Sequence, residues 1–201
     1  RALADYLRAA TRGPVAVAGH SMGGLLALML ARDQPDVVGR LMVVDVPAFF
    51  SLLISPFATP TSVSALAAAA RRRYLERDAA QLEAELRRSV RQLVTDPHTA
   101  ETVVGWGLRS DQALMAEIMA EVMTSDLRPD LPRIRAPADI VYAWERTGHA
   151  ARAGLDQLYA SAYKGLAGHR RLRIDDARHY VMLDQPEAFY GAMKLWLARR
   201  G

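Results

Sequence analysis

The stretch Gly19-His20-Ser21-Met22-Gly23-Gly24 decides the fold. The apolar run Pro14-Val15-Ala16-Val17-Ala18 precedes it, and a segment rich in leucine and alanine follows it as far as Arg32. An apolar run without polar alternation predicts a buried strand of a parallel sheet, and the segment after it has a helical pattern. Gly19 to Gly23 fits the pattern G-x-S-x-G, in which a serine sits on a sharp turn between a strand and a helix. We expect glycine at both ends because a side chain there would collide with neighbouring backbone.

The rest of the chain alternates between strand and helix signals. Further short strands are expected at 41–44, 140–143 and 171–174, and helices at 2–10, 22–32, 150–163 and 186–200. Two buried strands joined by a helix form a right-handed crossover unit of a parallel sheet. The alternation predicts an α/β fold in which helices cover both faces of that sheet.

The block 48–130 has a different character, because it contains no strand signal. Helical patterns are expected at 61–75, 78–94, 98–108 and 111–124, and residues that cap or break helices separate them. We therefore expect an α/β core made of residues 1–47 and 131–201. Residues 48–130 are expected to form a helical cap inserted into that core.

Composition excludes several classes of protein. The chain has 201 residues, of which 51% are hydrophobic and 24% charged, as in globular domains rather than disordered ones. No cysteine is present, so disulfides and cysteine-based catalysis or zinc binding are excluded. No apolar stretch approaches the roughly 20 residues of a membrane span. We expect a cytoplasmic protein without cofactor or metal.

The net charge of +4 and the pI of about 9.7 raise the question of a nucleic-acid partner. The basic residues are almost all arginines, scattered along the chain and often next to acids. No basic run is interleaved with aromatic residues in the way typical of single-strand binders. Nucleic acid is therefore not an expected partner.

Three segments resemble the α/β-hydrolase superfamily. They are Gly19-His20-Ser21-Met22-Gly23-Gly24, Leu41-Met42-Val43-Val44-Asp45 and His179-Tyr180-Val181-Met182-Leu183-Asp184-Gln185-Pro186. The similarity extends over nearly the whole chain. It implies a serine nucleophile, a histidine base after the last strand and an acid that orients the histidine, in the order Ser, acid, His. Ser21 and His179 match the first and last of these.

His179 is the expected base for chemical reasons as well. A serine hydroxyl is a poor nucleophile at neutral pH, and imidazole has the pKa that a general base needs. His179 lies between the last strand signal and the final helix. The other histidines fit less well, because His98 is typical of a helix start and His149 and His169 of exposed loops.

The acid is the open member of the triad. By resemblance it belongs in the loop after the strand 140–143, where this chain has Trp144-Glu145-Arg146 and no aspartate. Glu145 is preferred, because its longer side chain could reach across a short loop. Asp45 is the alternative, because some members of the superfamily carry the acid after the preceding strand. An aspartate at such a strand end can also simply cap the next turn.

The backbone N–H of Met22 is the expected first donor to an oxyanion. The second donor should come from a loop after a more N-terminal strand. By resemblance, about four strands and this loop would precede Arg1. The N-terminal part of the sheet is therefore expected to be missing from this chain, which leaves the strand at 14–18 with an unpaired edge.

The expected substrate-binding residues are His20, Phe49, Phe50 and Met119, although His20 could serve only a structural role. Met119 lies in a stripe with Met115 and Met123, and such stripes are usually core. If this stripe lines the cleft, the substrate is a small apolar ester-like molecule. The sequence thus predicts a serine hydrolase that cleaves carboxylic esters through an acyl-enzyme. Hydrolysis of a carbon–carbon bond or an amide by the same triad, or a non-catalytic interaction domain, are the alternatives.

Overall fold

Four parallel strands form the sheet. The computed structural model describes residues 2–146 and 151–199. The strands are β1 (Val15–His20), β2 (Val38–Val44), β3 (Ala138–Trp144) and β4 (Arg170–Asp175), and they lie in that order. The four expected strands are confirmed, each somewhat longer than predicted. Because they are parallel, their carboxyl ends lie along one edge of the sheet, where ligands bind in open α/β sheets.

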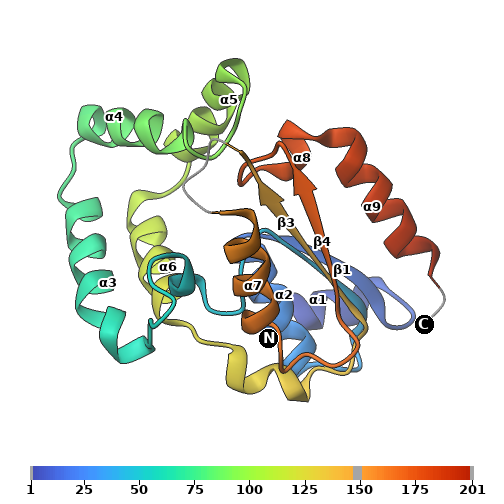
Figure 1. Ribbon diagram of the computed structural model, residues 1–201. Helices are drawn as coiled ribbons and strands as arrows, with labels where there is room; N and C mark the ends of the chain where they lie inside the picture. The colour runs from blue at the N-terminus through green and yellow to red at the C-terminus, as the bar shows by residue number, and fades with distance from the viewer. Residues whose placement is uncertain (1, 147–150, 200–201) are drawn as a thin grey trace.

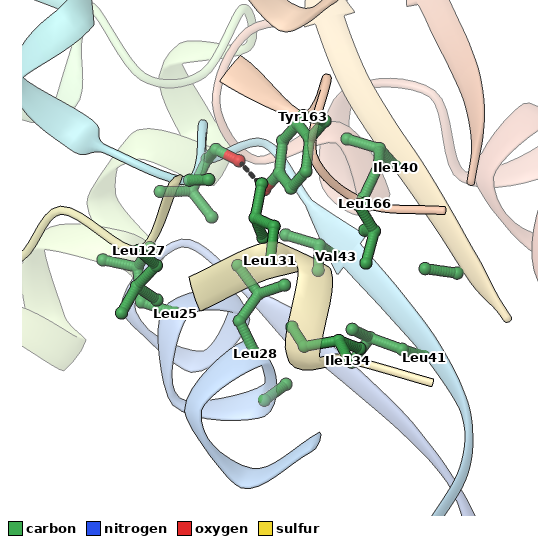
Figure 2. Packing of buried hydrophobic residues seen from close by; sticks show 14 of the residues in the cluster. Leu25, Leu28, Leu41, Val43, Leu127, Leu131, Ile134, Ile140, Tyr163 and Leu166 are labelled. Atoms are coloured by element: carbon green, nitrogen blue, oxygen red, sulfur yellow. Dashed lines mark hydrogen bonds between the residues drawn. The ribbon is translucent and has the colours of Figure 1, made fainter. Parts of the chain in front are cut away.

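One face of the sheet packs against α2 (Met22–Asp33), the short 3-10 helix η2 (Arg128–Arg133) and α7 (Arg152–Ala162). Figure 2 shows Leu25, Leu28, Val43 and Ile140 gathered around Leu131. Alternate residues of a strand point to opposite faces, so Val43 reaches this face while its neighbours in the sequence do not. The helices α1 (Ala2–Ala10) and α2 were expected at these positions.

The other face packs against α9 (Pro186–Ala198), which follows the one-turn helix α8 (Val181–Asp184). Met42 and Val141 of the central strands contact Phe189 and Trp196 of α9 there. The indole N–H of Trp196 donates to the Leu41 carbonyl at 3.1 Å. Helices on both faces confirm the α/β architecture expected from the alternating pattern.

β1 lies at the edge of the described sheet and pairs with β2. The prediction that the run 14–18 is buried is wrong, because Pro14, Ala16 and Ala18 are exposed and Val15 and Val17 are only half-buried. Their exposure agrees with the expected unpaired edge. Within the described residues, no other strand covers this side of β1.

The block 48–130 is helical, as its sequence predicts. It holds the 3-10 helix η1 (Phe50–Leu53) and the helices α3 (Pro60–Leu75), α4 (Ala79–Val90), α5 (Pro97–Leu108) and α6 (Gln112–Thr124). The carboxylates of Asp78, Asp96 and Asp111 accept backbone N–H groups at the starts of α4, α5 and α6. In Figure 1 α3, α4 and α6 lie to the left of the sheet, α5 lies at the top of the view, and α9 lies to the right. The division into a core and a cap remains a prediction.

Among the described helices, none has both the length and the apolar character needed to cross a membrane. The short elements η1, η2 and α8 were not predicted. Each spans no more than six residues, which is too short to leave a periodic hydrophobic pattern in the sequence.

Candidate active site

Ser21 joins β1 to α2 in a strained conformation. Its backbone has φ 54° and ψ −123°, and a non-glycine residue in such a region costs roughly 1–3 kcal/mol. The Ser21 N–H donates to the Val44 carbonyl at 2.8 Å, which ties the turn to the end of β2. The serine thus occupies the sharp strand-to-helix turn that the sequence predicts. Among the described residues, no hydrogen bond occupies its hydroxyl.

Three described non-glycine residues have a positive φ, and all follow a strand. They are Ser21 after β1, Asp45 after β2 and Asp176 after β4. Because the strands are parallel, these residues lie at the same edge of the sheet. Backbone strain of this kind persists only where the surroundings enforce it, and it concentrates at functional sites. The carboxyl edge of the sheet is therefore the candidate site.

The glycines around Ser21 have different roles. A Cβ on Gly19 would lie 2.1 Å from the Gly23 carbonyl oxygen, whereas a Cβ on Gly23 would meet nothing within 4 Å. The prediction that both glycines avoid a collision with backbone is right for Gly19 and wrong for Gly23. Gly24 is the second crowded position, because a Cβ there would lie 2.8 Å from Val46 and 2.9 Å from Val43 side-chain atoms.

We expect Gly19→Ala to lower the free energy of unfolding by at least about 2 kcal/mol, because backbone must move to admit the methyl group. Gly23→Ala is the matched control, and its better helix propensity should leave stability unchanged or slightly raised. Urea denaturation of both variants measures the difference. Equal stability of the two variants would contradict the proposed crowding at Gly19.

Asp45 is the carboxylate that contacts His179. Its Oδ2 lies 2.8 Å from His179 Nδ1, and both side chains are mostly buried. The Oδ1 accepts the Ala143 N–H at 2.9 Å and lies 3.4 Å from the Tyr159 hydroxyl. Burial and the nearby Asp45 raise the pKa of Tyr159 well above its usual value, so this hydroxyl stays a donor. The Ala143 N–H and the Tyr159 hydroxyl thus hold the Asp45 carboxylate in place independently of His179.

This arrangement sets the tautomer of His179. An ionised carboxylate only accepts hydrogen bonds, so Nδ1 carries the proton and Nε2 is left as an acceptor. A basic Nε2 is what a general base must present to a serine hydroxyl.

The preference for Glu145 over Asp45 as the partner of His179 is wrong in this structure. The Glu145 carboxylate instead accepts two hydrogen bonds from Arg178, Nε to Oε2 at 2.8 Å and Nη2 to Oε1 at 3.0 Å. The hydrogen bonds with Glu145 raise the pKa of Arg178, so the guanidinium stays charged. Arginine forms this two-point contact readily because its N–H groups match a carboxylate.

His20 contacts the backbone of the base. Its Nε2 lies 2.8 Å from the His179 carbonyl oxygen, and the two rings are 4.5 Å apart. Burial, reinforced by the neighbouring His179, lowers the pKa of His20 to about 4. The ring is therefore neutral near pH 7, and Nε2 carries the proton that it donates to the carbonyl. The expected substrate contact of His20 remains a prediction beside this positioning role.

Sequence reasoning missed two aromatic residues that connect the site to the helical block. The Tyr180 ring lies 5.1 Å from His20 and 5.4 Å from His179, between ring centroids. Trp106 of α5 lies 6.2 Å from Tyr180 and is partly exposed. The only sequence signal was that Tyr180 directly follows His179. No periodicity or spacing pointed to Trp106.

The expected substrate-binding residues have unequal exposure. The expectation that Phe49 binds substrate is wrong, because its side chain is fully buried. The Arg128 guanidinium lies over its ring, 5.0 Å from the ring centroid. Phe50 is half-buried, and Met119 of α6 is exposed. In the methionine stripe Met115 is half-buried, Met119 exposed and Met123 buried, so the stripe is part core and part surface.

Met22 is the first residue of α2, so its N–H has no acceptor within that helix. It stays the expected oxyanion donor. His98 lies in the first turn of α5, and His169 Nδ1 lies 2.6 Å from the Leu166 carbonyl, while His149 is outside the described residues. Over residues 2–146 and 151–199 no group of His, Asp and Glu side chains could hold a metal ion.

Comparison with known proteins gives a family match. Residues 1–192 match the model of the alpha/beta hydrolase family. The enol-lactonase from Burkholderia xenovorans LB400 superposes with a TM-score of 0.72 at 22% identity, over 98% of this chain and 69% of that one. A thermophilic esterase from Thermogutta terrifontis superposes with a TM-score of 0.73 at 18% identity, over 97% and 68%.

A curated relative matches over a shorter stretch. The sn-1-specific diacylglycerol lipase ABHD11 of Mus musculus is 58% identical over 33 residues, which are 16% of this chain and 11% of the lipase. The chain is therefore similar to that lipase in one local segment, while the solved structures share its fold along nearly all its length.

Proposed function

This chain belongs to the alpha/beta hydrolase family and has its fold, and from that premise we propose that it is a serine hydrolase that cleaves carboxylic esters. The observation that carries the proposal is the 2.8 Å contact between Asp45 and His179, at the sheet edge where Ser21 is strained. Ser21 is the nucleophile, His179 the base and Asp45 the acid.

In the first step the Ser21 Oγ attacks the ester carbonyl while His179 Nε2 takes its proton. The imidazolium that forms has Nδ1–H already directed at Asp45, so the carboxylate stabilises the new charge without moving. The Tyr159 hydroxyl and the Ala143 N–H hold Asp45 in that position. The same imidazolium then protonates the leaving alcohol.

The negative charge on the carbonyl oxygen needs a preorganised donor. The Met22 N–H supplies one, at the positive end of the α2 dipole. Collapse of the tetrahedral intermediate leaves an acyl group on Ser21. Water, deprotonated by His179, attacks this acyl-enzyme, and the acid is released as Ser21 regains its proton.

The substrate is proposed to be a small ester with an apolar part. Three relatives support the ester class, because lactones, esters and diacylglycerols all contain a carboxylic ester group. Met119 and Trp106 are both exposed and supply apolar surface on the helical block. Apolar walls with few polar groups are typical of sites for small molecules.

A fluorophosphonate probe tests the proposal, because it reacts with a serine that has an adjacent base. We expect stoichiometric labelling at Ser21, located by peptide mass spectrometry, and its complete loss in Ser21→Ala. Ser161→Ala, which removes an exposed serine of α7, should label like the unaltered protein. A folded protein that stays unlabelled and hydrolyses no p-nitrophenyl ester would support a non-catalytic interaction domain instead.

A further inference from the structure

The loop that carries His179 is bonded to the segment between α4 and α5. The Tyr180 N–H donates to the Leu93 carbonyl at 3.1 Å. The backbone N–H and the hydroxyl of Thr95 both donate to Asp184 Oδ1 at 2.9 Å. Two residues that follow the base, Tyr180 and Asp184, are therefore held by the segment between α4 and α5, about 90 residues away in the sequence.

Arg178 is the centre of these contacts. Its Nη1 donates to the Arg91 carbonyl at 2.6 Å and to the Val94 carbonyl at 2.9 Å. Its other guanidinium nitrogens bind Glu145 at the end of β3, and its backbone N–H donates to Asp184 Oδ2 at 2.8 Å. One partly buried side chain thus joins the sheet edge, the helical block and the loop of the base.

Apolar packing reinforces the connection. Tyr180 and Leu183 pack against a buried cluster of the helical block. The cluster consists of Val90, Val94, Ala100, Val103 and Val104. Tyr180 also contacts the His179 ring, so movement of the segment 91–95 would displace Tyr180 and, through it, the imidazole of the base.

We propose that Arg178 is a positioning residue, which ties the orientation of His179 to the docked position of the segment 91–95. The proposal rests on the function proposed above for Ser21 and His179. When the segment is docked, the loop is held on both sides of His179, and the imidazole keeps its contact with Asp45. When it separates, Arg178 loses two acceptors and Tyr180 one, and the loop is free to withdraw the imidazole.

A small displacement of His179 should affect the rate because proton transfer requires a precise distance between donor and acceptor. A misplacement of about 1 Å can cost roughly 100-fold in rate, whereas substrate binding depends on other surfaces. We therefore expect Arg178→Met to lower kcat between about 10- and 100-fold and to leave KM within about threefold. Arg178→Lys keeps the charge but lacks the fork that binds Glu145 at two points, so its kcat should lie between those of Arg178→Met and the unaltered protein.

The experiment measures the activity of the protein and the local opening of its backbone. Hydrogen exchange of the segments 91–95 and 178–184 should rise together in Arg178→Met. The matched control is Arg173→Met, which removes an arginine of β4 whose guanidinium binds two carboxylates, those of Asp156 and Asp175. This control should leave kcat and exchange in both segments unchanged.

The outcomes separate this proposal from the proposed function. If the fluorophosphonate probe never labels Ser21, the hydrolase proposal fails. Hydrogen exchange of the segments 91–95 and 178–184 still tests whether Arg178 holds the two segments together. The positioning role is overturned if kcat stays within threefold in Arg178→Met, if only KM changes, or if Arg173→Met has the same effect. Unchanged exchange at 91–95 also overturns it. Should Arg178→Met fail to fold, Arg178→Lys is judged by the same measurements.

Discussion

Replacing His179 by alanine should lower kcat for ester hydrolysis by about 10⁵- to 10⁶-fold, the scale seen when a triad base is removed. Ser21 then has no group to take its proton, because Asp45 is directed at Nδ1 of the missing ring rather than at the serine. The Met22 N–H remains, so a residual activity above the uncatalysed reaction should persist. Initial rates with a p-nitrophenyl ester measure the loss.

The control for this variant is His169→Ala. His169 lies just before β4 and contacts the Leu166 carbonyl, and the structure gives it no contact with Ser21, Asp45 or His179. Its kcat should match that of the unaltered protein. Thermal unfolding should show that His179→Ala remains folded, since the His179 side chain belongs to none of the hydrophobic clusters that form the core. If His179→Ala keeps a kcat within tenfold, His179 is not the base.

Local signals predicted most of the architecture. The strand at 41–44 has no polar alternation, and a buried parallel strand imposes that pattern on its residues. Asp96 and Asp111 are acids placed just before helical patterns, and both cap the helices that follow. These features depend on neighbours in the sequence, so the sequence alone reveals them. Phe49 was wrongly predicted to bind substrate, because its burial depends on Arg128 and other residues distant in the sequence that pack against it.

The site could be predicted only in part. Ser21 and His179 carry strong positional signals, a glycine turn after a strand and a loop after the last strand. The choice between Asp45 and Glu145 has no such signal, because both directly follow strands. It depends on Arg178, which lies 33 residues after Glu145 and binds it across the sheet edge. A tertiary contact of this kind leaves no spacing that a single sequence could show.

Asp45→Asn should lower kcat by about 10⁴-fold, the loss expected when the acid of a triad becomes an amide. The asparagine NH₂ would donate to His179 Nδ1, which forces the proton onto Nε2 and removes the acceptor that Ser21 needs. The fold should survive, because asparagine tolerates the positive φ of 52° at this position. The asparagine oxygen can still accept the Ala143 N–H. The change therefore tests charge and tautomer rather than backbone geometry.

Glu145→Gln is the matched comparison, because it also replaces a carboxylate by an amide at a strand end. Its oxygen can still accept one hydrogen bond from Arg178, so only part of the support for the loop is lost. We expect kcat to fall no more than about tenfold. The two variants thus differ by about three orders of magnitude if Asp45 orients the base. Removing the charge of the carboxylate that sets the histidine tautomer must cause the larger fall in kcat. A larger fall in Glu145→Gln than in Asp45→Asn would therefore reverse the assignment.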